Sequence, residues 1–151
     1  MGVGGSGGRA GGEPMIKGSC LCGAVAYEAD GLSGPVVHCH CHTCRKAHSA
    51  AFNTSARTRR DGFRWMRGED ALAAFESTPG KLRHFCGRCG SHLMAEWRDA
   101  SEVVLRVGSI DDGLEVLPVA HIWVSHAAEW DHGHDDLPRY AEGPGSPIVK
   151  T

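Results

Sequence analysis

The sequence predicts a single, mostly β domain made of short antiparallel strands. Short apolar runs recur along the 151-residue chain, and Gly, Pro or Asp punctuates them at close intervals. Such spacing is typical of a compact antiparallel β fold. Residues 24–29 (AVAYEA) alternate between two faces with a period of two, as half-buried strands do. Aromatic residues make up only 7% of the chain, so a domain of this kind would benefit from metal staples.

The first elements are two strands and a short third one. The first two strands flank a tight turn at Cys22-Gly23, and the third (PVVHC) ends at Cys39. Residues 43–52 (TCRKAHSAAF) contain good helix formers and predict a single helical turn.

The middle of the chain predicts a hairpin and an ambiguous segment. Residues 52–58 and 62–68 are predicted strands joined at Asp61-Gly62, a dipeptide typical of hairpin turns. Residues 68–77 (GEDALAAFES) fit a helical turn or a strand equally well. Further strands are expected at residues 81–86, 91–97, 102–110 and 119–124. Residues 131–147 are polar and rich in Pro and Gly, and we expect them to wrap the surface.

Composition limits the function classes. The 16 Lys and Arg residues against 18 Asp and Glu give a formal charge of −2, which favours neither DNA nor an anionic membrane. No run approaches the roughly 18 apolar residues of a spanning helix. Seven of the first twelve residues are Gly, which predicts a flexible tail over residues 1–14, with Met15 opening the folded part. Without an export signal we expect a reducing compartment, the cytoplasm, where clustered cysteines indicate metal rather than disulfides.

Seven cysteines carry the strongest signal, in C-x-C, C-x-C-x2-C and C-x2-C groups. They are Cys20, Cys22, Cys39, Cys41, Cys44, Cys86 and Cys89. Residues i and i+2 of a strand point to the same face, so each C-x-C pair can aim two sulfurs at one point. Disulfides are disfavoured because the count is odd and neighbouring cysteines bond with strain. A redox C-x-x-C would be expected beside a βαβ unit, which the sequence lacks.

Four of the cysteines form a predicted structural zinc site. Residues 86–90 (CGRCG) are typical of a zinc knuckle, which supplies two of the four ligands that a closed site requires. Cys20 and Cys22 are the available second pair, and Gly23 follows them. We therefore group Cys20, Cys22, Cys86 and Cys89 around one structural zinc.

The remaining trio, Cys39, Cys41 and Cys44, predicts a catalytic zinc. Three protein ligands leave one position of a tetrahedral ion open for chemistry. If residues 38–42 are extended, both cysteines point one way and His38, His40 and His42 point the other. A bend at His42 would instead let an imidazole close the site, and both zincs would then be structural.

At the level of whole motifs, the sequence resembles the glutathione-dependent formaldehyde-activating enzyme family, which includes centromere protein V. The resemblance is carried by GSCLCGAVAYE, VVHCHCHTCRKAHSAAF, RHFCGRCGSHL and AHIWVSHAAEWDHGHDDLPRYAEGP, in this order. It spans about residues 15 to 143 and implies a β-tent fold stapled by zinc, preceded by a tail at 1–14 and followed by a C-terminal tail at 144–151.

The resemblance also implies a function. It implies two zincs per chain, one structural on Cys20, Cys22, Cys86 and Cys89 and one at the active site on Cys39, Cys41 and Cys44. It further implies carbon–sulfur lyase chemistry on a thiol–aldehyde adduct, with glutathione or a similar thiol and formaldehyde or another aldehyde as substrates. The alternatives are a zinc-stapled binding module without catalysis and a thiol or metal sensor.

Charged and aromatic residues outside the cysteines suggest weaker hypotheses. Five arginines fall within residues 57–67, and Arg57 and Arg59 would share a strand face and offer a carboxylate-binding rim. A solvated charged face is the competing interpretation, and no base-reading motif supports a nucleic-acid partner. His121 is predicted to be a buried, hydrogen-bonded imidazole rather than a zinc ligand. Trp123 is predicted to lie in the core or a pocket wall.

Overall fold

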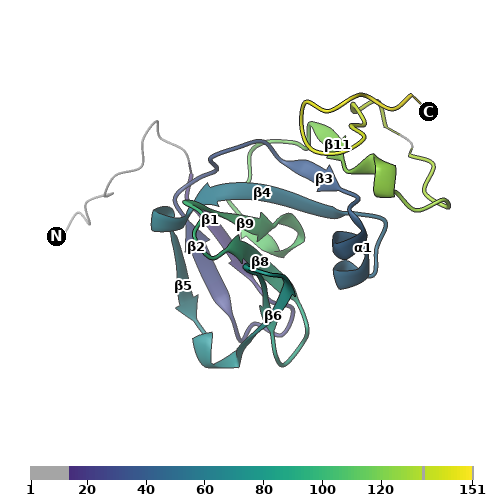
Figure 1. Ribbon diagram of the computed structural model, residues 1–151. Coiled ribbons are helices and arrows are strands. Elements are labelled where there is room, and N and C mark those ends of the chain that lie inside the picture. Colours follow the sequence, from purple (N-terminus) through teal and green to yellow (C-terminus); the bar gives the residue numbers. More distant parts are fainter. Residues whose placement is uncertain (1–13, 134, 151) are drawn as a thin grey trace.

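Two β-sheets make up the fold of the computed structural model, which describes residues 14–133 and 135–150 (Figure 1). The predicted Gly-rich tail lies outside these residues except for Pro14. Within the described residues, the strands are β1 (Ile16–Ser19), β2 (Ala26–Ala29), β3 (Val37–Cys39), β4 (Asn53–Arg59), β5 (Phe63–Arg67), β6 (Leu72–Thr78), β7 (Lys81–Cys86), β8 (His92–Trp97), β9 (Glu102–Arg106), β10 (Ile110–Asp112) and β11 (Ala120–Ile122).

A short α-helix, α1 (His42–His48), follows β3. It overlaps residues 43–52, where the sequence predicts a helical turn. Short 3₁₀ turns cover Arg60–Gly62, Glu69–Ala71, Val107–Ser109 and Val124–His126. The ambiguous segment 68–77 contains both predicted forms, since its 3₁₀ turn leads directly into β6. None of the helices within 14–133 and 135–150 is long and apolar enough to cross a membrane.

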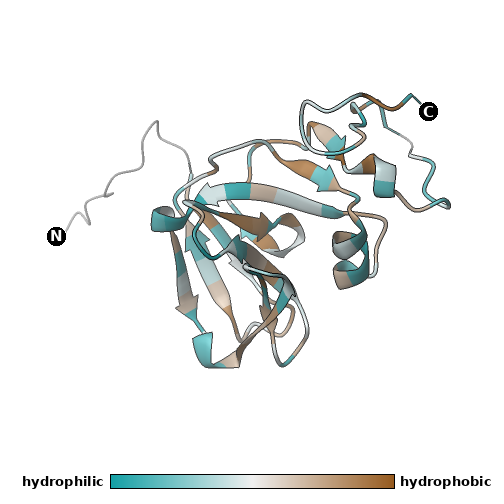
Figure 2. Cartoon of the chain, in the orientation of Figure 1, coloured by the Kyte–Doolittle hydropathy of each residue, from teal (hydrophilic) through white to brown (hydrophobic). Residues whose placement is uncertain are grey.

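The sheets confirm the mostly β, antiparallel prediction. The smaller sheet has the order β10-β1-β2-β5, and the larger one has the order β11-β3-β4-β9-β8-β7-β6. Among the strands of the described residues, every pairing is antiparallel except that of β11 with β3. Polar and apolar residues are interspersed along the strands rather than sorted into separate elements (Figure 2), as expected when each strand has one buried face.

The predicted hairpin at Asp61-Gly62 is wrong, although both of its strands exist. β4 pairs with β3 and β9 in the larger sheet, whereas β5 pairs with β2 in the smaller one. The 3₁₀ turn at Arg60–Gly62 carries the chain from one sheet to the other. The N–H of Asp30 donates to the carbonyl of Gly62 at 3.0 Å, so this corner is held by β2 rather than by β4.

The core lies between the two sheets. Ile16, Val25 and Tyr27 from the smaller sheet and its turn pack in one buried cluster with Leu93 and Leu105 from the larger sheet. The Tyr27 hydroxyl shares a hydrogen bond of 2.7 Å with Ser109, which satisfies its polar end. Because this face of the larger sheet is used for the core, its other face is free to form a site.

Strand register determines which residues share that other face. Cys39 lies opposite Asn53, Ser55 lies opposite Arg106, and Arg57 lies opposite Val104. On the next strands Ala95 lies between Val104 and Arg83, while Trp97 lies opposite Lys81. With a period of two along each strand, all of these side chains point to the same side. Cysteine, arginine and lysine side chains therefore gather on one surface of the larger sheet.

Candidate metal centres and pocket

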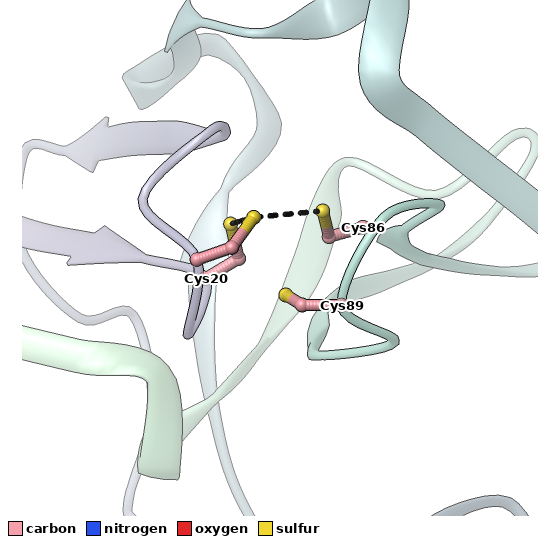
Figure 3. Close-up of side chains that lie close together, drawn as sticks. Cys20, Cys86 and Cys89 are labelled. Atoms are coloured by element: carbon pink, nitrogen blue, oxygen red, sulfur yellow. Dashed lines mark hydrogen bonds between the residues drawn. The ribbon is translucent and has the colours of Figure 1, made fainter.

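Four cysteines from two separate parts of the chain meet at one point (Figure 3). The sulfurs of Cys20, Cys22, Cys86 and Cys89 all lie within 4.8 Å of one another. The Cys22 Sγ is 3.6 Å from the Cys20 Sγ and 3.8 Å from the Cys86 Sγ. A tetrahedral zinc with bonds of about 2.3 Å places its sulfurs about 3.8 Å apart, so this spacing fits such an ion. The quartet that the sequence predicts is brought together, and it could hold a metal.

The turns after β1 and after β7 also aim backbone N–H groups at the sulfurs. The N–H of Val25 donates to the Cys20 Sγ at 3.3 Å, and the N–H of Arg88 donates to the Cys86 Sγ at 3.4 Å. Gly90 has a φ of 78° and its N–H donates to the Cys86 carbonyl at 2.8 Å, so the knuckle turn needs glycine there. Such donors stabilise thiolate, the form that binds metal.

The pKa values of two of the quartet's thiols, Cys89 and Cys22, shift in opposite directions, as expected for thiols crowded together. The Ser91 hydroxyl, followed by backbone N–H groups, lowers the pKa of Cys89 to about 5. A backbone N–H at Ala24 favours the Cys22 thiolate, but Cys20, burial and the other two sulfurs together raise the pKa of Cys22 to about 11. Only some of the sulfurs can be negative at neutral pH unless a cation joins them. The donor set therefore fits a zinc-like ion.

The second cluster is built at the junction of β3 and α1. The sulfurs of Cys39, Cys41 and Cys44 lie within 4.8 Å of one another, and no other His, Cys, Asp or Glu of the described residues joins them. Cys41 is the N-cap of α1, and its sulfur accepts a hydrogen bond of 3.3 Å from the N–H of Cys44. This capping contact places the two sulfurs side by side, while Cys39 reaches them from the end of the strand.

The trio's thiols compete for charge in the same way. Cys39 and Cys44 together lower the pKa of Cys41, because they donate to its thiolate. Cys41 and then Cys44 raise the pKa of Cys39, and burial raises it further. A cation placed among the three sulfurs would relieve this competition, so this cluster too could hold a metal ion.

Two of the three neighbouring histidines point away from the trio. The His40 Nε2 lies 2.8 Å from the His121 Nδ1, and the His38 Nδ1 lies 2.8 Å from the Thr54 hydroxyl. The His121 Nε2 in turn lies 2.9 Å from an Asp135 carboxylate oxygen. His121 is only 2% exposed. It is therefore the buried, hydrogen-bonded imidazole that the sequence predicts. Burial, together with the charge of His121, lowers the pKa of His40 to about 4, so it is neutral at pH 7.

His42 departs from the predicted pattern. The strand ends at Cys39 and α1 begins at His42, so the alternation of an extended chain does not reach it. His42 lines the pocket described next instead of joining His38 and His40. It does not close the trio either, since the metal-type cluster in the described residues contains sulfur only.

A pocket of about 760 Å³ opens onto the trio. Its floor is the free face of the larger sheet, and α1 closes one end with Cys41 to Cys44. Trp123 and His126 form part of its wall, with ring centroids 5.2 Å apart. Trp123 has a φ of 58°, unusual for a bulky residue, and such strain is found mainly at functional sites. The pocket-wall interpretation of Trp123 is confirmed, although β11 ends one residue before it.

The chain is similar to known proteins in both its sequence and its structure. The sequence profile described as "Glutathione-dependent formaldehyde-activating enzyme" matches residues 15–126. The chain belongs to this family. A solved structure of a Rhodobacter sphaeroides protein is similar to the chain, with 26% identity and a TM-score of 0.54. The match covers 67% of this chain and 89% of that one. No curated protein matches the chain.

In this family member the predicted arginine rim is only partly in place. Arg57 lines the pocket, with its Nη1 3.5 Å from a Glu102 oxygen. Arg59 instead forms an ion pair with Asp61 at 3.0 Å, and both of these side chains are exposed to solvent. Arg59 is therefore not part of the pocket lining, and carboxylate binding by Arg57 stays a prediction.

Sequence reasoning missed three other cations. Lys81 and Arg106 line the pocket, and Arg83 lies beside the trio with its Nη1 3.9 Å from the Cys44 Sγ. The available signal was their position in predicted strands, where Lys81 and Arg83 share one face and Arg106 alternates with Leu105. Which face becomes the pocket depends on pairing between strands, which a single sequence does not specify.

Proposed function

We propose that the protein is a zinc-dependent carbon–sulfur lyase that joins a thiol to an aldehyde, and separates them again, at the trio of Cys39, Cys41 and Cys44. The observation that supports this most is the position of three sulfurs, without a fourth protein ligand among the described residues, on the wall of a large pocket. Membership in a family described by glutathione and formaldehyde supports the same reaction class.

In the proposed reaction, the thiol sulfur bonds to the aldehyde carbon, and the thiol proton ends on the former carbonyl oxygen. The product is a hydroxyalkyl thioether, and the reverse direction breaks the same carbon–sulfur bond. A zinc ion at the trio would favour the thiolate form of the incoming thiol and would polarise the aldehyde. His42 and His126 line the pocket and are the imidazoles available there to carry the proton.

The quartet has a different proposed role. Its ligands come from the β1–β2 turn and from the turn after β7, so one zinc would tie the smaller sheet to the larger. With four sulfurs on the ion no position is left for substrate, and the contribution is to folding. Cys20 and Cys86 are buried in the core cluster, which agrees with a structural site.

Exchange spectroscopy tests the proposed reaction. Proton NMR of formaldehyde with glutathione or a smaller thiol measures the rate of adduct exchange with and without the zinc-loaded protein. We expect faster exchange with the protein and no acceleration with Cys41→Ser, after the spontaneous rate is subtracted. Acceleration that survives in Cys41→Ser would contradict a role for the trio. A protein that accelerates no thiol–aldehyde pair would leave the zinc-stapled binding module.

A further inference from the structure

Three cations on the pocket face of the larger sheet form no ion pair with any carboxylate of the described residues. Among the described residues, ion pairs account for Arg57, Arg59, Arg60, Arg64 and Arg98. Lys81, Arg83 and Arg106 have no acidic partner there. Lys81 and Arg83 come from β7 and Arg106 from β9, and all three point to the pocket side.

Two of these cations are almost completely buried. Arg83 is 2% exposed and Arg106 is 4% exposed. Arg83 donates to the Ser77 hydroxyl at 2.9 Å and the Thr43 hydroxyl at 3.2 Å, and lies 3.9 Å from the Cys44 sulfur. Arg106 donates to Ser55 at 3.3 Å, while its Nε and Nη2 are buried and find no hydrogen-bond partner within residues 14–133 and 135–150. Burying charge in this way is costly unless an opposite charge is close.

The third cation, Lys81, is the one nearest to solvent and still carries like-charge strain. Its ammonium group lies 5.5 Å from the centre of the Trp97 ring, a cation–π contact rather than an ion pair. Burial lowers the pKa of Lys81, and the charges of Arg83 and Arg106 lower it further. An anion beside Lys81 would relieve both effects.

The trio does not supply enough negative charge to balance this face. Three thiolates around a divalent ion carry a net charge of about −1. Against three cations, about two positive charges remain. A neutral thiol that binds as thiolate would offset one of them, and a thiol that also bears a carboxylate would offset both. The pocket's charge is thus complementary to an acidic thiol.

We propose that Lys81 and Arg106 are specificity-determining residues that bind the carboxylate of an acidic thiol while its sulfur occupies the trio. This assignment rests on the proposed carbon–sulfur reaction and names its thiol substrate class. Arg83, which is buried against Cys44, neutralises the sulfurs instead of contacting the substrate. The determinant is the carboxylate, so the pocket accepts a small acidic thiol without a peptide around it.

Three thiols of similar size and different charge test the proposal: 3-mercaptopropionate, 2-mercaptoethanol and cysteamine. With formaldehyde and zinc-loaded protein, we expect the lowest KM for 3-mercaptopropionate, by roughly tenfold over 2-mercaptoethanol. Lys81→Gln should remove most of this preference, and Lys81→Glu should invert it in favour of cysteamine. Lys17→Gln, on the exposed side of β1, is the matched control and should change nothing.

A binding measurement separates this proposal from the reaction on which it rests. The unreactive thioether 3-(methylthio)propionate should bind the zinc-loaded protein more tightly than the neutral 3-(methylthio)propanol in ligand-observed NMR. Lys81→Gln should abolish the difference. Equal binding of the two thioethers, or equal KM values for all three thiols, would overturn the proposal even if exchange is accelerated. A preference for the acid without accelerated exchange would support the anion site and reject the proposed reaction.

Discussion

At the scale of single residues, Arg83 is a cation in contact with a sulfur of the proposed metal site at the trio. Its guanidinium group is buried and lies 3.9 Å from the Cys44 sulfur, with Ser77 and Thr43 as its other partners. Charge close to a ligand sulfur favours the thiolate that binds metal. Loss of a group that orients a metal ligand typically lowers metal affinity by about 10- to 100-fold.

We therefore expect Arg83→Met to release the zinc at the trio to a competing chelator at roughly tenfold lower chelator concentration than the wild type. The zinc at the quartet should be retained as in the wild type, since Arg83 does not contact the quartet. A chromogenic chelator titration measures both. Arg98→Met, whose exposed guanidinium pairs with Glu76 at 2.7 Å, is the matched control. Equal retention of both zincs in Arg83→Met would contradict this role.

The sequence predicted the cysteine clusters of the candidate site correctly where the spacing of metal-ligand residues was sufficient to group them. The quartet and the trio could be grouped from spacing, because C-x-C and C-x2-C units can each aim two sulfurs at one ion. Lys81 and Arg106 could not be assigned, because their shared face arises from pairing of β7, β8 and β9. His42 does not follow the extended alternative, because β3 ends at Cys39 and α1 begins at His42.

At the scale of elements, the pairing of β1 with β2 depends on a glycine. Gly18 lies opposite Tyr27, and a Cβ at Gly18 would overlap the Tyr27 ring. The ring also packs against Phe63 and Trp65, at centroid distances of 5.4 and 6.1 Å, so it has little room to move. Overpacking of this kind typically costs about 1–3 kcal/mol.

Gly18→Ala should accordingly lower the free energy of unfolding by about 1–3 kcal/mol in urea denaturation of the zinc-loaded protein. Gly108→Ala is the control, because a Cβ there would meet nothing within 4 Å. It should be neutral within experimental error. If the two variants were equally stable, the packing of Tyr27 over Gly18 would not be the constraint.

The docking of α1 predicts a pH dependence. His48, at its C-terminal end, packs against His92, with ring centroids 4.4 Å apart and the ring planes tilted by 50°. Burial, followed by the charge of Arg106, lowers the pKa of His48 to about 3. An unfolded histidine titrates near 6.5, so between about pH 6.5 and 3 the unfolded chain binds a proton that the folded chain does not.

Stability should therefore fall as pH decreases through that window, with a slope of at most about 1.4 kcal/mol per pH unit for this proton. His48→Gln removes the titrating group, and its stability should depend less steeply on pH than that of the wild type. Urea denaturation at several pH values between 5 and about 6.5 measures the difference. Identical slopes would show that His48 protonates as easily when folded as when unfolded.

The element-level predictions from the sequence failed at one corner for a physical reason. Asp61-Gly62 carries a genuine turn signal, yet the chain passes from one sheet to the other there. A local signal specifies that the chain bends, while the choice of partner strand depends on contacts far along the chain. The β1–β2 turn at Cys22-Gly23 was predicted correctly because its partners are adjacent in sequence.

At the scale of the whole molecule, we propose different roles for the two candidate metal sites, stability for the quartet and chemistry for the trio. The proposed quartet joins the smaller sheet to the larger through its two turns, whereas the proposed trio lies at the edge of the pocket, between β3 and α1. Loss of the zinc at the quartet should unfold the domain, since structural zinc contributes folding energy directly. Loss of the zinc at the trio should leave the two-sheet core intact.

Metal content and circular dichroism of two single variants test this division. We expect two zincs per chain in the wild type. Cys41→Ser should lose one zinc and the exchange activity, while its β signal and its melting temperature change little. Cys89→Ser should lose the quartet's zinc and should be unfolded, so it should show no cooperative thermal transition. If Cys41→Ser unfolds as completely as Cys89→Ser, the trio is structural as well.

The most direct test of the open trio is a crystal structure of the zinc-loaded protein with anomalous data at the zinc edge. Two peaks are predicted. One should lie among the sulfurs of Cys20, Cys22, Cys86 and Cys89, and the other should contact Cys39, Cys41 and Cys44 with solvent or a small ligand as its fourth partner. A fourth protein atom bound to the second ion, or no second peak at all, would contradict the account.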